Sequence, residues 1–366
     1  MLSQAQRSRQ PWIHSAAFDL VFILAPALLV TLFVLARPDW FSGPVAVSPL
    51  AWLLLVLCVD VSHVYSTLYK TYFDPAEFRE RRTLYTLVPL FVWLAGVVLY
   101  SFGALAFWRT LAYLAVFHFV RQQYGFMRLY SVEDNRGARL LNAAAIYAAT
   151  LYPLVYWHTN LPRQFQWFVE GDFVSLPWSW LESAAFIAYV AVLSLYLLKE
   201  VWVGWRRRSV NLPRNLLLIG TALSWYVGIV TFNGDLAFTA TNVIAHGLPY
   251  LALIWITGRK RESSLIFGVR RGWVFGAMAA PLFVGFLVVL AFVEEGFWDA
   301  LVWRDHTSIF GLFSFLPQLT DAALLAFVVP LLAVPQATHY VLDGFIWRRG
   351  RVVAASETAA PVRAAS

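Results

Sequence analysis

Apolar segments of about 20 residues alternate with short polar segments along nearly the whole chain, and a helix of that length spans a bilayer. The pattern predicts ten transmembrane helices, at residues 17–36, 45–69, 83–101, 105–128, 140–157, 179–198, 215–233, 236–257, 273–293 and 322–346. The sequence therefore predicts an all-α, polytopic integral membrane helical bundle that forms one domain over residues 1–349. The small and polar residues 350–366 are expected to form a disordered C-terminal tail.

The composition agrees with a membrane protein. Of 366 residues, 60% are hydrophobic and 13% are charged, whereas soluble domains carry about 25% charged residues. The net charge of +7 does not indicate a nucleic-acid partner, because the basic residues follow the predicted topology. With the N-terminus in the cytoplasm, all Lys and Arg residues except Arg37, Arg109, Arg163 and Arg304 fall at the cytoplasmic side, as the positive-inside rule requires. Both termini are expected in the cytoplasm, in a multi-pass protein of a bacterial inner membrane.

Four of the seven histidines lie inside predicted membrane helices, each in a different helix and each three or four residues from a polar side chain. The four stretches are Asp60-x-x-His63, His118-x-x-Arg121-Gln122, Asn242-x-x-x-His246 and Gln336-x-x-His339-x-x-x-Asp343. Ionisable side chains are costly inside a bilayer, so their presence there indicates a functional site. His14 lies just before the first predicted helix.

These four histidines are predicted to share one layer of the membrane. Their helices all run from outside to inside, and a rise of about 1.5 Å per residue places the histidines roughly 10–20 Å from the cytoplasmic helix ends. The acids well inside the predicted helices are Asp19, Asp60 and Asp343, and each accompanies a histidine of this layer. The pattern therefore predicts that the imidazoles converge.

Converging histidines and carboxylates are typical of a metal site. We predict that the metal ligands are His63, His118, His246 and His339, with His14 as a candidate fifth ligand. Iron is the expected metal, because histidine and carboxylate ligands with open coordination positions suit O₂ activation.

Four further residues are candidate catalytic residues. Asp60 and Asp343 either orient a metal-bound histidine through its second ring nitrogen or bind the metal themselves. Arg121 and Gln122 follow His118 by about one helical turn, although an arginine near a helix end can also extend to the membrane interface. The prolines near two of the histidines, Pro249 and Pro335, are expected to distort their helices locally.

The same residues also fit other interpretations. Histidines and carboxylates inside helices that proline interrupts suit a transporter with a proton or ion relay, and two of the histidines suit a haem-binding electron carrier. A polar network that holds the helices together would explain one or two such residues, but five poorly. No Walker or Rossmann glycine motif is present, so electrons for an oxygenase would come from a separate donor protein.

Parts of the chain resemble the Brp/Blh family of membrane β-carotene oxygenases. The stretch from His14 to Asp19 resembles the family's H-G-A-L-D motif with one residue inserted, and Asp60 with His63 resembles its second histidine–aspartate motif. The stretch from His118 to Gln122 is similar to H-x-x-R-H, with Gln122 in place of the second histidine, and 334–339 resembles V-P-H with three residues inserted. The resemblance implies histidine-bound iron and a lipophilic substrate.

These observations together predict a membrane-embedded, metal-dependent oxidoreductase. Its partners are expected to be membrane lipids, a lipophilic small-molecule substrate and a separate electron donor.

Overall fold

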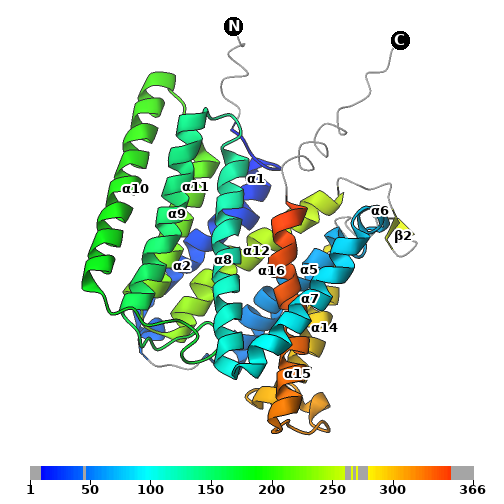
Figure 1. Ribbon diagram of the computed structural model, residues 1–366. Coiled ribbons are helices and arrows are strands. Elements are labelled where there is room, and N and C mark those ends of the chain that lie inside the picture. Colours follow the sequence, from blue (N-terminus) through cyan, green and yellow to red (C-terminus); the bar gives the residue numbers. More distant parts are fainter. Residues whose placement is uncertain (1–9, 44–46, 260–264, 267–268, 271–278, 348–366) are drawn as a thin grey trace, which may run out of the picture. The chain divides into compact units, whose positions relative to one another are not determined.

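The computed structural model describes residues 10–43, 47–259, 265–266, 269–270 and 279–347, and these are almost entirely helical (Figure 1). They divide into two compact units. Unit 1 comprises the chain up to Val56 and residues Trp108–Pro249, and unit 2 comprises Leu57–Phe107 and the chain from Tyr250 onward. The divisions fall inside three elements: the π-helix η3 (Leu53–Val61), α8 (Ala104–Tyr130) and α12 (Asp235–Arg259).

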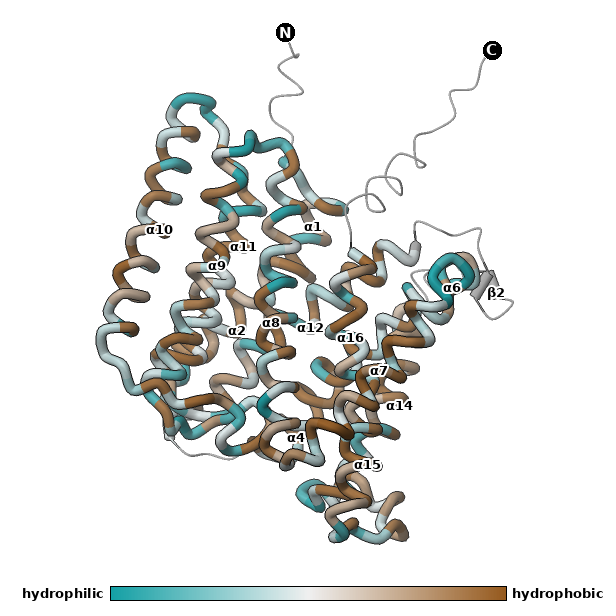
Figure 2. Tube along the Cα trace, viewed as in Figure 1, coloured by the Kyte–Doolittle hydropathy of each residue, from teal (hydrophilic) through white to brown (hydrophobic). Residues whose placement is uncertain are grey.

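Unit 1 consists mainly of long helices with short connections. Besides its parts of η3, α8 and α12, its elements are α1 (Ala16–Asp19), η2 (Leu20–Leu24), α2 (Ala25–Ala36), α3 (Pro38–Phe41), α4 (Pro49–Trp52), α9 (Arg136–Thr159), α10 (Ser179–Arg207), α11 (Leu212–Trp225) and η5 (Tyr226–Thr231). Helix α9 packs against α10 and α11, and α11 packs against α2 (Figure 1). Figure 2 shows hydrophilic residues at the upper end of α10 and hydrophobic residues along its middle.

Capping residues explain where two of these helices begin. The Asn135 side chain accepts a hydrogen bond from the N–H of Ala138 at the start of α9. Asn211 caps α11 in the same way, by accepting a hydrogen bond from the N–H of Arg214. Such side chains satisfy N–H groups of the first turn that have no partner within the helix. Pro213 in the first turn of α11 has the fixed φ that suits this position.

The core of unit 1 is aromatic. It includes Phe119 of α8, Trp157 of α9, Phe238 of α12, and Phe165 and Phe173 of the connection between α9 and α10. The Trp157 ring lies 4.6 Å from that of Phe165 and 5.0 Å from that of Phe238, which are distances of favourable aromatic pairs. The connection is therefore packed against the helices that carry two of the histidines.

Unit 2 contains shorter elements around three longer helices. Besides its part of η3 and the start of α8 and end of α12, its elements are α5 (Ser62–Ser66), η4 (Thr67–Lys70), α6 (Pro75–Glu80), α7 (Arg82–Ser101), β1 (Leu265–Ile266), β2 (Val269–Arg270), α14 (Ala280–Trp298), η7 (Asp299–Trp303), η8 (Gly311–Phe313), α15 (Ala322–Leu332) and α16 (Val334–Ile346). The two short strands pair antiparallel. Helix α14 packs against α5, and α7 packs against both α15 and α16.

Two histidines of the predicted site follow irregular helical segments. The π-helix η3 ends at Val61, directly before α5 with His63. Helices α15 and α16 meet at an angle of 42°, and Pro335 lies in the first turn of α16, so the distortion predicted near this proline is confirmed. Helix α12, in contrast, continues through Pro249 without interruption.

Seven of the described helices are long and apolar enough to cross a membrane, or eight if the bent pair α15 and α16 forms one span. The prediction of a helical, multi-pass membrane protein is therefore supported, but the count of ten is not confirmed. Two predicted spans do not meet the criterion within the described residues. In α8 the polar side chains include Arg109, His118 and Arg121, and α11 is only 14 residues long before the backbone changes to the π-helix η5.

The predicted span at 273–293 requires a correction. Residues 273–278 lie outside the described residues, and the helix extends beyond 293 through α14 and η7 to Trp303. Glu294, Glu295 and Asp299 therefore lie on a helix and not in a loop. The predicted tail at 350–366 lies outside the described residues.

Candidate metal centre

Unit 2 brings His63 and His339 together. His63 lies on α5 and His339 lies in the middle of α16. Both residues are 1% exposed, and their ring centroids are 5.0 Å apart with the ring planes at 78°. The ring of Tyr250 from α12 lies against both, with its centroid 5.6 Å from that of His63 and 5.0 Å from that of His339. The two imidazoles are thus buried and in edge-to-face contact.

A chain of three hydrogen bonds ends at His339. The Tyr250 hydroxyl donates to Asp343 Oδ1 over 2.6 Å, the Tyr250 and Thr67 hydroxyls are 2.9 Å apart, and Thr67 Oγ1 lies 2.7 Å from His339 Nδ1. A hydroxyl group has one hydrogen to donate, so Tyr250, which donates to Asp343, accepts from Thr67. Thr67 therefore accepts from the Nδ1–H of His339. This direction of donation fixes the tautomer in which Nε2 holds the lone pair for a metal.

The two predicted carboxylates relate differently to their histidines. Asp60 Oδ1 lies 3.6 Å from His63 Nδ1, and the Asp60 side chain is 25% exposed. Asp343 Oδ1 lies 4.0 Å from His339 Nδ1, which is too far for a direct hydrogen bond. Asp343 instead influences His339 through the two hydroxyl groups of the hydrogen-bonded chain.

Replacing Thr67 with valine is expected to weaken metal binding about 10- to 100-fold, the usual effect of removing a group that orients a metal-bound histidine. Valine keeps the shape of threonine but offers no acceptor to Nδ1 of His339. The measurement is a competition titration of the metal between a chelator and the detergent-solubilised protein. Thr67→Ser keeps the hydroxyl and should bind metal as the wild type does. Wild-type affinity in Thr67→Val would show that the hydroxyl does not orient His339.

Unit 1 brings His118 and His246 together. His118 lies on α8 and His246 on α12, and they are 3% and 1% exposed. Their ring centroids are 4.9 Å apart with the ring planes at 82°. The Phe119 ring stacks on that of His246 with a centroid distance of 3.6 Å and an angle of 10°. Each unit thus contributes one buried histidine pair, and an aromatic side chain lies against each pair.

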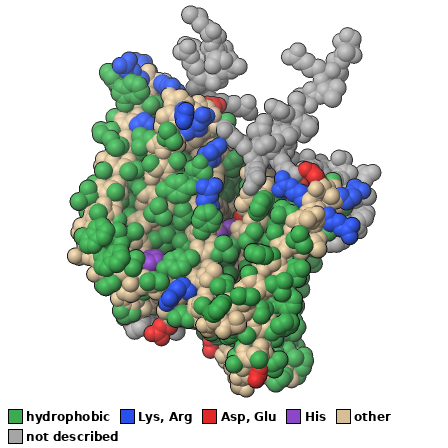
Figure 3. Space-filling view, in the orientation of Figure 1, with side chains coloured by type: hydrophobic (Ala, Val, Ile, Leu, Met, Phe, Trp, Pro, Cys, Tyr) green, Lys and Arg blue, Asp and Glu red, His purple; other side chains and the backbone are tan. Residues whose placement is uncertain are grey.

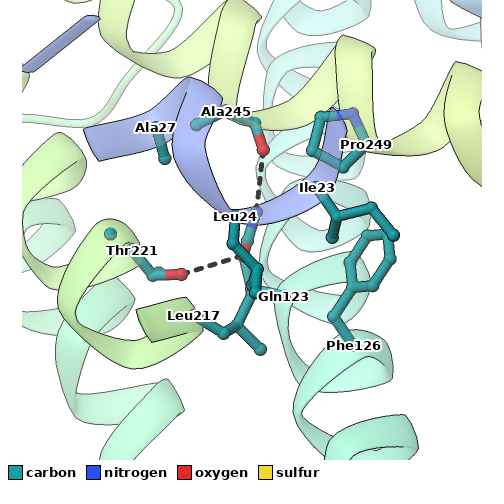
Figure 4. A pocket seen from close by; sticks show the side chains of 10 residues that line it. Ile23, Leu24, Ala27, Gln123, Phe126, Leu217, Thr221, Ala245 and Pro249 are labelled. Carbon is teal, nitrogen blue, oxygen red and sulfur yellow. Dashed lines mark hydrogen bonds between the residues drawn. The ribbon is translucent and has the colours of Figure 1, made fainter. Parts of the chain in front are cut away.

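Polar side chains of unit 1 satisfy the backbone that Pro249 disturbs. Proline has no N–H, so the carbonyl of Ala245 lacks its usual helical partner. Gln123 Nε2 donates to this carbonyl over 3.4 Å, and the Thr221 hydroxyl donates to Gln123 Oε1 over 2.9 Å (Figure 4). These residues line a small pocket of unit 1. Such compensation is how proline is tolerated in membrane helices.

Two amide side chains flank His246. Gln122 Nε2 donates to the backbone oxygen of His246 over 3.0 Å, and Asn242 Nδ2, one turn earlier on α12, donates to the backbone oxygen of Phe238 over 3.0 Å. Gln122 Oε1 and Asn242 Oδ1 are buried and accept no hydrogen bond from the described residues. Because buried carbonyl oxygens usually have a partner, these two atoms suit a ligand that carries a hydrogen-bond donor.

The four histidines are all buried, and they form two pairs, His63 with His339 in unit 2 and His118 with His246 in unit 1. This group of four buried histidines is compatible with a metal site. That all four bind one metal ion stays a prediction. Neutral imidazole is the commonest metal ligand that proteins offer.

His14 and Asp19 are not part of this group. The side chain of His14 is exposed. The buried carboxylate of Asp19 accepts hydrogen bonds from the backbone N–H of Ile13 and of His14, over 2.6 and 3.1 Å, and from the Tyr130 hydroxyl over 3.1 Å. Asp19 therefore holds the chain that leads into α1, and the structure does not bring the His14 ring to the other histidines.

Arg121 lies on α8 with His118, but it is not part of the buried pair of His118 and His246. Its side chain is exposed, and its Nη1 donates to the hydroxyl of Tyr147 on α9 over 2.6 Å. The guanidinium group therefore lies on the surface of unit 1.

Thr67 and Tyr250 were not predicted as site residues from the sequence. Thr67 follows His63 by four residues, and Tyr250 follows His246 by four residues. This is the same one-turn spacing that identified Asp343 after His339, so it could have identified both hydroxyl groups. Threonine and tyrosine are common in apolar helices, which is why neither residue stood out.

No protein-family model, curated protein or solved structure matches this chain. The resemblance to the Brp/Blh family stays a prediction.

Proposed function

We propose that this protein is a membrane-embedded oxidoreductase that binds iron through histidines and acts on a lipid or another lipophilic molecule. The observation that supports this most strongly is that four buried histidines on four different helices form two pairs, one within each unit. Ionisable side chains are rare inside membrane helices and are usually functional there. Two imidazoles in contact favour a common ligand, and a metal ion is the ligand that imidazoles share.

The residues present fit an iron ion. Imidazole is a ligand suited to iron, copper, zinc and nickel, and carboxylate oxygens beside imidazoles favour iron sites with open positions. The hydroxyl of Thr67 directs Nε2 of His339 toward a metal, and Asp60 offers a carboxylate beside His63. The unpartnered oxygens of Gln122 and Asn242 suit a further bound group that donates hydrogen bonds.

When bound, iron would supply the redox chemistry of O₂ activation. The chain itself holds and shields the site. Thr67 and Tyr250 keep the His339 ring in one orientation, as the hydrogen-bonded chain requires. Phe119 covers one face of His246 and excludes water from it.

A lipophilic substrate fits the surroundings of the site. Large hydrophobic side chains remain exposed along helices of both units, and a molecule dissolved in the bilayer can approach such helices from the side. The absence of a nucleotide-binding motif from the sequence implies that electrons come from a separate donor protein, if the reaction needs them.

The alternatives have less support. A transporter with discontinuous helices was expected to show breaks near both Pro249 and Pro335. The bend between α15 and α16 lies beside Pro335, but α12 continues through Pro249. A haem held by both histidines of one pair would lie between their rings. In each pair the rings touch edge to face, with centroids 4.9 or 5.0 Å apart, which leaves no room for a macrocycle.

The test is the metal content of detergent-purified protein, measured by mass spectrometry together with an absorption spectrum of the same sample. The expected result is stoichiometric iron without the Soret band of haem. Protein purified anaerobically without chelator that contains no metal, and that drives proton-coupled uptake in proteoliposomes, would replace this proposal with the transporter.

A further inference from the structure

A stripe of side chains runs along one face of α8 in unit 1. Tyr113, Phe117, Arg121, Tyr124 and Arg128 recur at intervals of three or four residues, which places them on one side of the helix. Phe117 is 62% exposed and Tyr113 is 37% exposed, and both arginines are exposed. The stripe is therefore aromatic at one end and basic at the other.

The basic end of the stripe is organised by two tyrosines. Besides its hydrogen bond to Tyr147, the guanidinium of Arg121 lies 4.7 Å from the centre of the Tyr124 ring. Arg128 Nη1 donates to the Tyr124 hydroxyl over 3.0 Å, and the two tyrosine rings stack with centroids 5.1 Å apart. Within the described residues, no carboxylate pairs with either arginine. Two fixed cations without a counter-charge suit an anionic ligand.

The position of Arg121 along α8 indicates which kind of anion binds there. Arg128 lies near the end of the helix at Tyr130, whereas Arg121 lies seven residues earlier, about 10 Å further along the axis. A phospholipid phosphate at the membrane surface would be at the level of Arg128. Arg121 is deeper, where an uncompensated charge is costly, so it suits a smaller anion that reaches below the headgroups.

The donors around Arg121 match a carboxylate. A guanidinium can bind a carboxylate through two parallel hydrogen bonds. The Tyr147 hydroxyl accepts from Arg121 and keeps its own hydrogen to donate. Toward the other end of the helices, Phe117 and Leu151 of α9 are 62% and 47% exposed, and Leu151 lies one turn beyond Tyr147. A hydrocarbon chain attached to the carboxylate can lie against these side chains.

We propose that this stripe binds a long-chain carboxylate, such as a fatty acid, with its carboxylate on Arg121 and Tyr147 and its chain along Phe117 and Leu151. In Figure 3, most of the Lys and Arg side chains of the helical unit at the left lie toward its upper end, and hydrophobic side chains cover much of its side. Arg121 follows His118 by three residues, so the bound chain begins within one turn of a candidate metal ligand. The proposed binding of the carboxylate depends on residues of unit 1 alone. A role of this carboxylate as the substrate rests on the proposed function.

The experiment measures equilibrium binding of radiolabelled oleate to the purified full-length protein in detergent. Arg121→Gln is expected to weaken oleate binding at least tenfold, because it removes the charge that pairs with the carboxylate. The matched control is Arg206→Gln, since Arg206 of α10 is also exposed and lies 5.4 Å from the ring of Trp202. This control should bind oleate as the wild type does, and oleyl alcohol, which has the same chain length, should displace oleate only weakly.

Three results would overturn the proposal: unchanged oleate binding in Arg121→Gln, displacement of oleate by oleyl alcohol as effective as by unlabelled oleate, or displacement by phosphatidylglycerol at equal concentration. The last would assign the site to lipid headgroups. Metal content is measured on the same samples, and Arg121→Gln should keep its metal. Protein that contains no metal but binds oleate through Arg121 would reject the proposed function and retain this site.

Discussion

Replacing His339 with alanine is expected to remove the bound metal from the purified protein while the chain still inserts and folds. His339 is buried in edge-to-face contact with His63, and its Nδ1 is already used by Thr67. The variant loses a metal ligand, whereas Thr67→Val loses only a group that orients one. Its metal affinity should therefore fall by more than the roughly 100-fold that the loss of an orienting residue can cause.

The measurement compares metal content per protein in wild type, His339→Ala and a control histidine variant. His158→Gln is a suitable control, because His158 at the end of α9 bonds Tyr113 and the Leu154 carbonyl and is not in the group of four. It should keep its metal. Size-exclusion chromatography verifies that each variant is folded. Full metal retention in both His339→Ala and His63→Ala, with folded protein, would reject the assignment of these two histidines as ligands.

The helical, multi-pass character of the chain could be predicted because it depends on hydrophobicity summed over about 20 residues. The exact ends of the helices could not be predicted. The predicted span ended at 293, so Glu294 and Glu295 were expected to begin a loop. They instead continue α14. A hydropathy pattern could not show this, because it does not distinguish a helix from a loop at charged residues. Conversely, α8 is continuous over 27 residues although its charged and amide side chains weaken its hydrophobic pattern.

The histidine cluster could be predicted because ionisable side chains are costly in apolar helices and are retained there mainly where they serve a function. The details depended on the direction in which each side chain points, which spacing alone does not give. Asp343 lies one turn after His339, yet its carboxylate reaches the histidine only through Tyr250 and Thr67. Thr67 is distant in sequence from His339, and no periodicity links them. His14 precedes an acid as His339 does, but Asp19 bonds the backbone of His14.

A largely buried ionic network in unit 1 joins α10, α11 and the connection between α8 and α9. Arg214, in the first turn of α11, is 3% exposed and pairs with Asp134 and with Glu200 of α10. Lys199 lies 2.6 Å from Glu200, and Asn215 donates to the same carboxylate over 2.9 Å. A cation at a helix N-terminus is unfavourable for the helix dipole, so the two carboxylates offset both the position and the burial of Arg214.

Replacing Arg214 with methionine is therefore expected to destabilise the protein by about 3–5 kcal/mol, the typical cost of removing one partner from a buried ion pair. Methionine fills a similar length, but it leaves the buried Glu200 and the partly buried Asp134 without the guanidinium that satisfied them. The effect is measured as the shift in unfolding when dodecyl maltoside micelles are titrated with sodium dodecyl sulfate. Arg206→Met, at an exposed position on α10, should change stability by only about 0.5 kcal/mol or less.

The comparison separates two roles of charge in this chain. If Arg214→Met unfolds at the same detergent ratio as Arg206→Met, the network contributes nothing to stability, and the buried arginine must be retained for another reason. If it unfolds much earlier but still binds metal before unfolding, the network is structural and independent of the histidines. The second result is expected, because Arg214 donates to Asp134, to Glu200 and to the Tyr196 hydroxyl, and the histidines of the candidate metal centre lie on other helices.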